Sequence, residues 1–343
     1  MQPQPGTNII NLTRTDYAGG KSTLCVGCGH DSITNNIISA FFFFFFDPYD
    51  VAKMSGIGCS SKTPGYFLNR SAGFNSVHGR MAPVATGAKI ANRKLITFGV
   101  SGDGDTASIG LGSFAHLIRR NLPMAYIVEN NGVYGLTKGQ FSATADRNSK
   151  QKAGSLNPFE SIDLCSLALD IGCSFVARSF SGDAKQLVPL LSAALRHRGT
   201  ALIDVISPCV TFNNHEGSSK SYDAVRDHNL QLQQLGFIQP FEEKKVDYAE
   251  GEVERVDMHD GSVLTLRKLD TKKHDVHNRQ AAQRLLQETK NSGEILTGLF
   301  YLDTNCVNFL DTLNIGDKPL GQLTEAETRP SKEVFSKILA EFK

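Results

Sequence analysis

The sequence contains no tryptophan and no apolar segment long enough to cross a membrane. Its most conspicuous apolar run is six consecutive phenylalanines at positions 41–46, whereas a membrane-spanning helix needs about 20 apolar residues. The first 22 residues also lack the apolar segment and the cleavage site of a secretory signal peptide. We therefore expect a cytoplasmic protein that does not associate with membranes.

An excess of charge of either sign is also missing. The 36 lysines and arginines nearly balance the 35 aspartates and glutamates, and the formal net charge is +1. Proteins that bind nucleic acids or anionic membrane surfaces usually carry a clear excess of basic residues. The composition therefore gives no reason to expect a nucleic-acid partner.

The seven cysteines do not have the pattern of a disulfide-stabilised protein. Their number is odd and no signal peptide is expected, so a reducing compartment is the better expectation. One Cys-x-x-Cys pair is present at positions 25 and 28, but there is no second pair and no His-x₃₋₅-His. This argues against a zinc ribbon or finger, and metal ligation is the better interpretation of any cysteine cluster.

Segments with the patterns of strands and helices alternate over the first two thirds of the chain. Apolar runs predict the strands, and apolar residues three and four positions apart predict the helices. The predicted strands cover residues 51–55, 95–100, 124–128, 174–177 and 201–206, and the predicted helices cover residues 31–46, 106–121, 162–171 and 183–198. This alternation is typical of an α/β fold with a mostly parallel, doubly wound sheet, whose ligands bind at the carboxyl ends of the strands.

The character of the sequence changes after about residue 210. Residues 240–280 are charged and polar, and the segments 253–256 and 262–266 alternate around a His-Asp-Gly turn, which predicts a β-hairpin. We predict three regions: an N-terminal arm (1–22), a cofactor-binding domain (23–225) and a C-terminal extension (226–343) that packs on the domain or on a partner.

A Gly-Asp-Gly-Asp motif at positions 102–105 follows one predicted strand, and an Asn-Asn pair at positions 130–131 follows the next. Mg²⁺ prefers oxygen ligands and usually binds through few protein groups together with phosphate oxygens. Asp103 offers a carboxylate, Asn131 an amide oxygen and Val133 a backbone carbonyl, while the glycines let backbone N–H groups approach phosphates. The alternative is a plain strand–turn–helix in which Asp103 only lies near the helix N-terminus.

Four cysteines are candidates for a common site. Cys25 and Cys28 form the Cys-x-x-Cys pair, Cys59 lies in a glycine-rich turn after one strand, and Cys209 follows another. Four thiolates can hold a [4Fe–4S] cluster, and the alternatives are a zinc site, a redox-active pair or no ligand at all. The remaining cysteines are two expected core thiols and one without a predicted role, namely Cys165, Cys173 and Cys306.

The spacing of the Gly-Asp-Gly and Asn-Asn motifs is similar to the thiamine-diphosphate signature of transketolase-like and decarboxylase enzymes. Six segments also closely resemble the beta subunits of 2-oxoacid:ferredoxin oxidoreductases, in that family's order and spacing. They are residues 25–30, 56–62, 78–80, 102–105, 130–140 and 207–209. The resemblance spans residues 24–225 and implies the doubly wound fold of a thiamine-diphosphate-binding domain.

The resemblance also implies which residues bind cofactors. The family pattern implies that a [4Fe–4S] cluster is bound by Cys25, Cys28, Cys59 and Cys209, and Mg²⁺ by Asp103, Asn131 and the carbonyl of Val133. It implies that thiamine diphosphate is lined by Ile57, Gly58, Cys59, Ser60, His78, Gly104, Asp105, Gly135 and Leu136. Of these, His78 is expected to bond a diphosphate oxygen or to assist proton transfer.

By resemblance, the activity is coenzyme A-dependent oxidative decarboxylation of a 2-oxoacid to acyl-CoA and CO₂, with reduction of ferredoxin. Residues 134–140 and 214–222 resemble the 2-oxoglutarate type, whose product is succinyl-CoA. Lys62 and Lys138 are candidates for binding a second substrate carboxylate, and the alternative for each is a solvated surface charge. The family takes a carboxylate needed for cofactor activation from its alpha subunit, so an obligate alpha–beta assembly is expected.

The chain departs from the usual family pattern at several positions. Leu24 stands where the family often has tryptophan, Val26 and Ala143 stand where it often has proline, and the run of six phenylalanines is unusual. None of these departures removes a predicted ligand. Two other functions stay open at this point: a thiamine-diphosphate enzyme without a redox role, and a zinc-stabilised binding module without catalysis.

Overall fold

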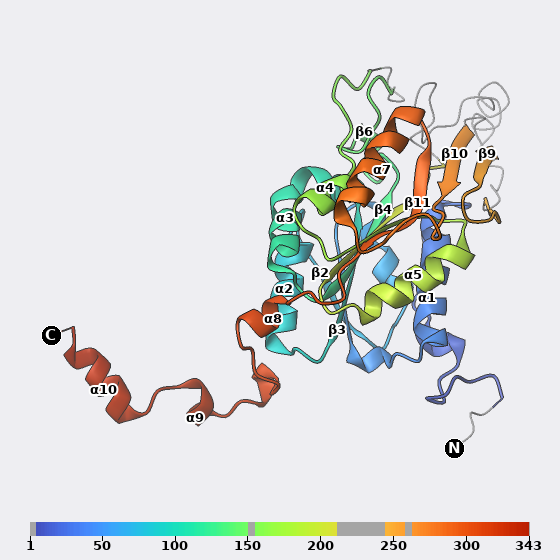
Figure 1. Cartoon of the computed structure of the whole chain (residues 1–343). Helices are drawn as coiled ribbons and strands as arrows, with labels where there is room; N and C mark the ends of the chain where they lie inside the picture. The colour runs from blue at the N-terminus through green and yellow to red at the C-terminus, as the bar shows by residue number, and fades with distance from the viewer. Residues whose placement is uncertain (1–4, 150–154, 211–243, 258–262, 343) are drawn as a thin grey trace.

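A computed structural model of the chain describes residues 5–149, 155–210, 244–257 and 263–342. Its centre is a nine-stranded sheet with the order β2-β1-β3-β4-β8-β7-β11-β10-β9, and helices cover both faces (Figure 1). The six strands from β2 to β7 in this order are parallel, whereas β11 is antiparallel to β7. The mostly parallel, doubly wound α/β fold predicted from the sequence is therefore confirmed.

Five strands of the sheet agree with the sequence prediction within a few residues. They are β1 (Val51–Ser55), β3 (Ile96–Gly102), β4 (Met124–Asn130), β7 (Phe175–Phe180) and β8 (Thr200–Ile206). Every residue of β4, β7 and β8 is buried, as expected for central strands covered on both faces. The edge strand β2 (Ala72–Asn75) is exposed throughout, so no apolar pattern predicts it.

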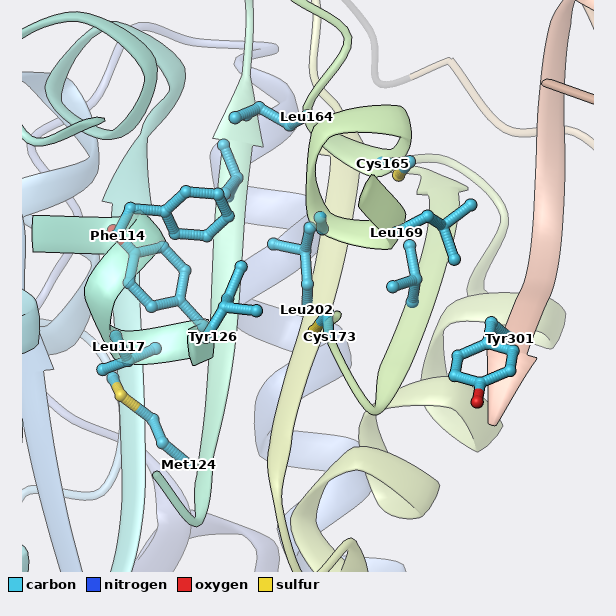
Figure 2. Close-up of a cluster of buried hydrophobic side chains, with 14 of the residues drawn as sticks. Phe114, Leu117, Met124, Tyr126, Leu164, Cys165, Leu169, Cys173, Leu202 and Tyr301 are labelled. Atoms are coloured by element: carbon cyan, nitrogen blue, oxygen red, sulfur yellow. The ribbon is translucent and has the colours of Figure 1, made fainter. Parts of the chain in front are cut away.

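Four helices cover one face of the sheet, and the sequence prediction lacks the first and the last of them. They are α2 (Met81–Ala91), α3 (Leu111–Arg120), α4 (Leu164–Asp170) and α7 (Arg279–Ser292). Figure 2 shows part of the core beneath them, where the ring of Phe114 packs edge-on against Tyr126 with centroids 5.2 Å apart. Cys165 and Cys173 are fully buried in the same cluster, so both are core thiols, as expected.

Two helices, α1 (Gly29–Phe43) and α5 (Ala184–Arg196), cover the opposite face. The ring of Phe41 in α1 is fully buried and packs edge-on against Phe98 of β3, with centroids 5.4 Å apart. The first phenylalanine of the run is therefore part of the core, and it connects α1 to the middle of the sheet.

Of the remaining phenylalanines of the run, Phe42 and Phe46 are half-buried and pack against this core, whereas Phe43 and Phe45 are exposed. Helix α1 ends at Phe43, three residues before the predicted end at 46, and Phe45 has a left-handed φ of +62°. The guanidinium of Arg196 lies over the rings of Phe44 and Phe46, at 4.7 Å and 5.5 Å from their centroids. These cation–π contacts hold the turn that follows the helix.

The helix predicted over residues 106–121 is interrupted. A π-helical turn covers Asp105–Ile109, and α3 begins only at Leu111. The N–H of Gly110 donates to the carbonyl of Asp105 at 2.7 Å. A Cβ atom at Gly110 would lie 2.5 Å from that same oxygen, so the close approach requires glycine at this position.

The part of the N-terminal arm that the structure describes, residues 5–22, lies against the body of the protein. A short 3₁₀ turn, η1 (Arg14–Tyr17), places the fully buried ring of Tyr17 in the core. The side chain of Asn8 donates to the Tyr17 hydroxyl at 2.8 Å, and Ala18 pairs with Phe67 in an isolated bridge. The arm is thus anchored by the buried ring of Tyr17 and by backbone hydrogen bonds to the segment around Phe67.

The C-terminal segment adds three strands to the same sheet. β9 (Val253–Asp257) and β10 (Val263–Lys268) are antiparallel neighbours, which confirms the strands of the predicted hairpin. Their connection, residues 258–262, lies outside the described residues. β11 (Ile295–Leu302) lies between β10 and β7. Among all the helices that the structure describes, none is long and apolar enough to span a bilayer.

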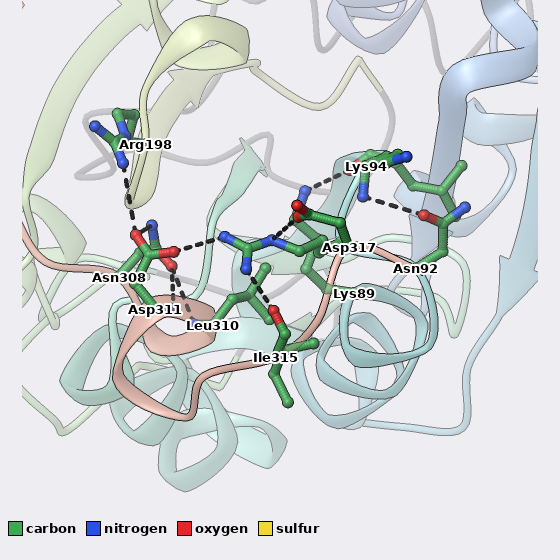
Figure 3. A network of polar contacts seen from close by, with 11 residues as sticks. Lys89, Asn92, Lys94, Arg198, Asn308, Leu310, Asp311, Ile315 and Asp317 are labelled. Carbon is green, nitrogen blue, oxygen red and sulfur yellow. Dashed lines mark hydrogen bonds and ion pairs between the residues drawn. The ribbon is translucent and has the colours of Figure 1, made fainter. Parts of the chain in front are cut away.

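Beyond β11 the chain forms three short helices, α8 (Phe309–Thr312), α9 (Glu325–Thr328) and α10 (Lys332–Ala340). Figure 3 shows the polar contacts around Asp311 at the root of this segment. Arg93 Nη2 lies 2.6 Å from Asp311 Oδ1. Arg198 lies 3.5 Å from the other oxygen of the same carboxylate. Helix α8 is therefore held on the body, whereas α9 and α10 extend away from it (Figure 1).

Replacing Phe41 by alanine is expected to lower the free energy of unfolding by about 3–5 kcal/mol, because a buried ring is replaced by a cavity. Phe43, in the same run, is 54% exposed, and Phe43→Ala is expected to change that free energy by about 1 kcal/mol or less. Urea denaturation of the full chain measures both changes. Equal losses of unfolding free energy in Phe41→Ala and Phe43→Ala would contradict the assignment of Phe41 to the core and of Phe43 to the surface.

Candidate active site

Four neighbouring parallel strands place the predicted ligands together at the carboxyl ends of the strands. β1, β3, β4 and β8 are adjacent, and all three pairings between them are parallel. Each strand is followed at once or after a few residues by a predicted ligand, namely Cys59 after β1, Asp103 after β3, Asn131 after β4 and Cys209 after β8. The carboxyl ends of parallel strands are where α/β sheets bind ligands.

Asp103 is buried, and three donors hold its carboxylate. Oδ1 accepts the backbone N–H of Asn131 at 3.3 Å, and Oδ2 accepts the hydroxyl of Thr144 at 2.6 Å and that of Ser142. Neither hydroxyl group was predicted from the sequence. No periodic pattern could have indicated them, because they reach Asp103 through a hairpin of two-residue strands.

The other two predicted magnesium ligands lie next to Asp103. The side-chain oxygen of Asn131 accepts the backbone N–H of Val133 at 3.0 Å, and both residues are buried. A carboxylate, an amide oxygen and a backbone carbonyl are the hard donors that suit Mg²⁺. Within the described ranges, no group of three or more His, Cys, Asp or Glu side chains could hold a metal ion, so the fit rests on oxygen donors that phosphate oxygens would complete.

Asp105 joins two loops beside this position. Its Oδ1 accepts the N–H of Gly79 at 2.7 Å, and its Oδ2 accepts the hydroxyl of Ser101 at 3.1 Å. Burial raises the pKa of the Asp105 carboxyl, although these hydrogen bonds, the N–H of Ile57 and the nearby charge of His78 oppose the increase. Ile57 and His78 therefore lie near Asp105, and their role in lining a cofactor stays a prediction.

A short hairpin, β5 (Val133–Tyr134) and β6 (Gln140–Phe141), contacts the loop after β3. The hydroxyl of Tyr134 donates to the carbonyl of Gly104 at 2.7 Å. A Cβ atom at Gly104 would lie 2.5 Å from the Tyr134 ring, so this packing needs glycine. Gly135 and Leu136 follow in the turn of the hairpin, where Gly135 is buried and Leu136 is exposed.

The turn at residues 57–60 completes the predicted lining. Gly58 has a φ of +97°, which side chains rarely adopt, and no atom lies near its missing Cβ position. Ser60 is buried, and its hydroxyl donates to the carbonyl of Ile57 at 3.2 Å. A Cβ atom at Gly102 would lie 3.1 Å from Ser60 Oγ, so this turn packs against the end of β3.

The four predicted cluster cysteines influence one another electrostatically. Burial raises the pKa of the Cys59 thiol to about 11, and negative charge at Cys209 and Cys25 contributes to the increase. Burial likewise raises the pKa of Cys28, with contributions from Cys209 and Cys59. None of the seven cysteines, all of which are described, forms a disulfide. The thiols are close enough to affect one another's pKa, but no group of three or more His, Cys, Asp or Glu side chains among the described residues is placed to hold a metal ion, so cluster ligation by these cysteines stays a prediction.

A buried carboxyl group that the sequence analysis missed lies near these cysteines. Glu129 of β4 is fully buried, its Oε2 accepts the hydroxyl of Thr63 at 2.9 Å, and the same oxygen lies 3.7 Å from His30 Nε2. Burial raises the pKa of Glu129 and lowers the pKa of His30 to about 4. Near neutral pH the His30 imidazole is therefore uncharged, and its contact with Glu129 is not an ion pair. The sequence signal that could have indicated this site was the presence of a glutamate, Glu129, inside an otherwise apolar strand.

The two predicted substrate lysines occupy different surroundings. The Nζ of Lys62 lies 3.5 Å from the carbonyl oxygen of Thr23, and its charge opposes the raised pKa of Cys59. Lys138 is exposed in the β5–β6 turn and has a φ of +78°. Residues 214–222, which resemble the 2-oxoglutarate type, lie outside the described residues.

Comparison with known proteins identifies the family. Residues 55–205 match the family described as thiamine pyrophosphate enzyme, C-terminal TPP binding domain. The chain is 42% identical over 191 residues to the 2-oxoacid:ferredoxin oxidoreductase subunit beta of a Sulfolobus species, which covers 55% of this chain and 63% of that protein. It is 37% identical over 191 residues to the 2-oxoglutarate synthase subunit KorB of Methanocaldococcus jannaschii. The aligned region covers 55% of this chain and 69% of that protein. The chain belongs to the family of 2-oxoacid:ferredoxin oxidoreductase beta subunits.

The likeness to this family extends to a solved structure. A 2-oxoglutarate:ferredoxin oxidoreductase from Magnetococcus marinus, with 2-oxoglutarate, coenzyme A and succinyl-CoA bound, matches with a TM-score of 0.73 and 28% identity over 97% of both chains. The chain spans 63% of the length of the Sulfolobus beta subunit and 60–61% of two beta subunits from Aeropyrum pernix. The beta-subunit family recognised from the sequence is therefore confirmed.

Gly104→Ala is expected to displace the ring of Tyr134, because the added carbon would lie 2.5 Å from it. We expect the free energy of unfolding to fall by about 1–3 kcal/mol, as is typical of overpacking. The matched control is Gly87→Ala in α2, where an added Cβ meets nothing within 4 Å, so stability should rise by up to about 1 kcal/mol. Thermal denaturation compares the two variants, and an unchanged Gly104→Ala protein would argue against the close packing.

Proposed function

We propose that this chain is the thiamine-diphosphate-binding beta subunit of a coenzyme A-dependent 2-oxoglutarate:ferredoxin oxidoreductase. The observation that carries the proposal is the buried carboxylate of Asp103 at the end of β3, next to Asn131 at the end of β4. The reaction converts 2-oxoglutarate and coenzyme A into succinyl-CoA and CO₂, and two electrons pass to ferredoxin. Membership of the beta-subunit family supports this assignment.

The donor set fits a magnesium diphosphate. Asp103, Asn131 and the carbonyl of Val133 would hold Mg²⁺, and diphosphate oxygens would complete its coordination. The cofactor itself would lie against the turn at residues 57–60 and the β5–β6 hairpin, where glycines allow the backbone to come close to a ligand. Its lining would be Ile57, Gly58, Cys59, Ser60, His78, Gly104, Asp105, Gly135 and Leu136.

The chemistry of the site is divided between cofactors and protein. Bound thiamine diphosphate supplies a carbon nucleophile suited to cleaving a 2-oxoacid, and a bound [4Fe–4S] cluster supplies a one-electron acceptor. The protein positions these groups: the carboxyl of Asp105 holds the loop of Gly79, and the Tyr134 hydroxyl holds the end of β3. His78, beside Asp105, would bond a diphosphate oxygen, and the cluster would be held by Cys25, Cys28, Cys59 and Cys209.

An alpha subunit would complete the enzyme. The Sulfolobus and Aeropyrum relatives are named as beta subunits, which implies a partner chain in those proteins. In the family, the carboxylate that activates the cofactor belongs to that partner, and no motif for it is found in this sequence. The proposed assembly is therefore an alpha–beta pair that binds 2-oxoglutarate and coenzyme A and transfers electrons to ferredoxin.

The second carboxylate of 2-oxoglutarate needs a cationic partner, and Lys62 and Lys138 would supply it. Lys62 lies close enough to Cys59 to affect the pKa of its thiol. Lys138 follows the predicted lining residues Gly135 and Leu136 in the same turn, and its ammonium group makes no hydrogen bond or ion pair to any part of the chain that the structure describes. An ammonium is a compact point charge suited to a carboxylate.

Asp103→Asn is expected to weaken Mg²⁺-dependent binding of thiamine diphosphate by more than about 100-fold, because it removes the one carboxylate of the donor set. Isothermal titration calorimetry on the full chain purified with its alpha subunit measures the loss. The control is Asp50→Asn. Asp50 directly precedes β1, so it lies at the amino ends of the strands, whereas Asp103 lies at their carboxyl ends. Unimpaired cofactor binding by the Asp103 variant would contradict the proposed site.

Lys138→Ala is expected to raise the KM for 2-oxoglutarate about tenfold and to leave the KM for 2-oxobutyrate nearly unchanged, since a lost charge pair of about 1.4 kcal/mol corresponds to a factor of ten. Ferredoxin reduction by the alpha–beta assembly, assayed without oxygen, measures both constants. Lys94→Ala is the control, because Lys94 is exposed and precedes the amino end of β3. Equal changes for the two substrates would remove Lys138 from the specificity of the enzyme.

A further inference from the structure

A buried series of hydrogen bonds leads from Asp103 to Arg178. The hydroxyl of Thr144 lies 2.6 Å from Asp103 Oδ2 and 3.0 Å from Asn130 Oδ1. The amide nitrogen of Asn130 donates to Asp204 Oδ1 at 2.9 Å, and Arg178 Nε donates to Asp204 Oδ2 at 2.9 Å. None of the five residues is more than 8% exposed.

The sheet sets the order of these links. Asn130 is the last residue of β4, Asp204 lies in the neighbouring β8, and Arg178 lies directly opposite Asp204 in the parallel pairing of β7 with β8. Arg178 Nη2 also donates to Asp163 Oδ2 at 2.6 Å, and Asp163 caps the N-terminus of α4. Two carboxylates from different elements therefore fix the guanidinium.

The direction of the hydrogen bonds follows from the chemistry of the groups. An ionised carboxylate only accepts, so Asp204 turns the NH₂ group of Asn130 toward itself, and the amide oxygen of Asn130 faces Thr144. The hydroxyl of Thr144 has one proton and two acceptors, Asn130 Oδ1 and Asp103 Oδ2. The two acceptors share this proton, and the hydroxyl of Ser142 donates to the same oxygen of Asp103. A flipped amide of Asn130 would turn its oxygen toward Asp204, where two acceptors would then face each other.

The guanidinium of Arg178 is accessible to small solutes. A cavity of about 300 Å³ lies at this end of the sheet, and its lining includes Asn130, Thr144, Arg178 and Asp204. Every link between Arg178 and Asp103 therefore borders the same cavity. A guanidinium ion is smaller than this space, so it can reach the position of the Arg178 head group if the side chain is shortened.

We propose that Arg178 is a positioning residue for the magnesium diphosphate site, acting on Asp103 through Asp204, Asn130 and Thr144. Arg178 orients Asp204, which orients the amide of Asn130. The hydroxyl of Thr144, together with that of Ser142, then fixes Oδ2 of Asp103, while Oδ1 accepts the N–H of Asn131. Contacts that orient a metal ligand typically contribute about 10- to 100-fold to metal affinity. This inference rests on the proposed function, because it requires that Asp103 binds Mg²⁺.

The first test removes the hydroxyl that touches Asp103. In the full chain purified with its alpha subunit, Thr144→Val is expected to raise the Mg²⁺ concentration needed for thiamine diphosphate binding by about 10- to 100-fold. Thr144→Ser keeps the hydroxyl and should restore binding to near the wild-type level. Thr97→Val is the matched control, because the Thr97 hydroxyl is buried on β3, the strand that Asp103 follows, and has no hydrogen-bond partner among the described residues.

The second test shortens Arg178 and adds its head group back. Arg178→Ala should bind Mg²⁺ and thiamine diphosphate about 10- to 100-fold more weakly. Millimolar guanidinium should restore much of the affinity, whereas urea, which has the same shape but no charge, should not. Wild-type Mg²⁺ affinity in Arg178→Ala, or equal restoration by urea, would overturn the proposal. If this variant does not fold, the Thr144 series alone decides.

The two proposals fail in different ways. If the wild-type assembly does not bind thiamine diphosphate with Mg²⁺, the proposed function itself is wrong. If the wild type binds and Thr144→Val binds equally well, the site stands but the positioning series has no role. Thr144→Ser that remains as weak as Thr144→Val would also overturn the positioning role, because the loss would then not depend on the hydroxyl.

Discussion

The parallel pairing of β1, β3, β4 and β8 is the constraint on which the rest of the site depends. It places Gly102 of β3 opposite Glu129 of β4, and Asn130 of β4 opposite Ile206 of β8. A shift of one residue in any of these pairings would turn every side chain of a strand to the other face. Because both faces are packed with apolar side chains, the core fixes the register. The register in turn fixes where the polar loops begin.

The loops that follow these strands bind one another through buried polar groups. The carboxylate of Asp103 is bound by the segments after β4 and β6, and the carboxyl of Asp105 is bound by the loop of Gly79 and by Ser101. A buried polar group that loses its partner costs about 1–3 kcal/mol. Each loop therefore stabilises its neighbour in one arrangement. These contacts preorganise the loops, and preorganisation lowers the entropic cost of binding.

The sequence predicted the parts of the structure that local patterns encode. The central strands have long apolar runs, and Asp103 and Asn131 were found because each follows such a run. The exposed strand β2 and the two-residue strands β5 and β6 have no such pattern.

The contacts of Thr144, Glu129 and Arg178 depend on segments that are distant in the sequence, so only the finished fold brings them together. Charged residues inside apolar strands were the one available signal for Glu129 and Arg178. The thiols and the oxygen ligands are proposed to converge at the carboxyl ends of the central strands. Anomalous diffraction at the iron absorption edge, from anaerobically grown crystals of the alpha–beta assembly, tests this most directly. The account predicts an iron signal enclosed by Cys25, Cys28, Cys59 and Cys209, at the sheet edge that carries Asp103. A map with no iron among these four sulfurs would contradict it.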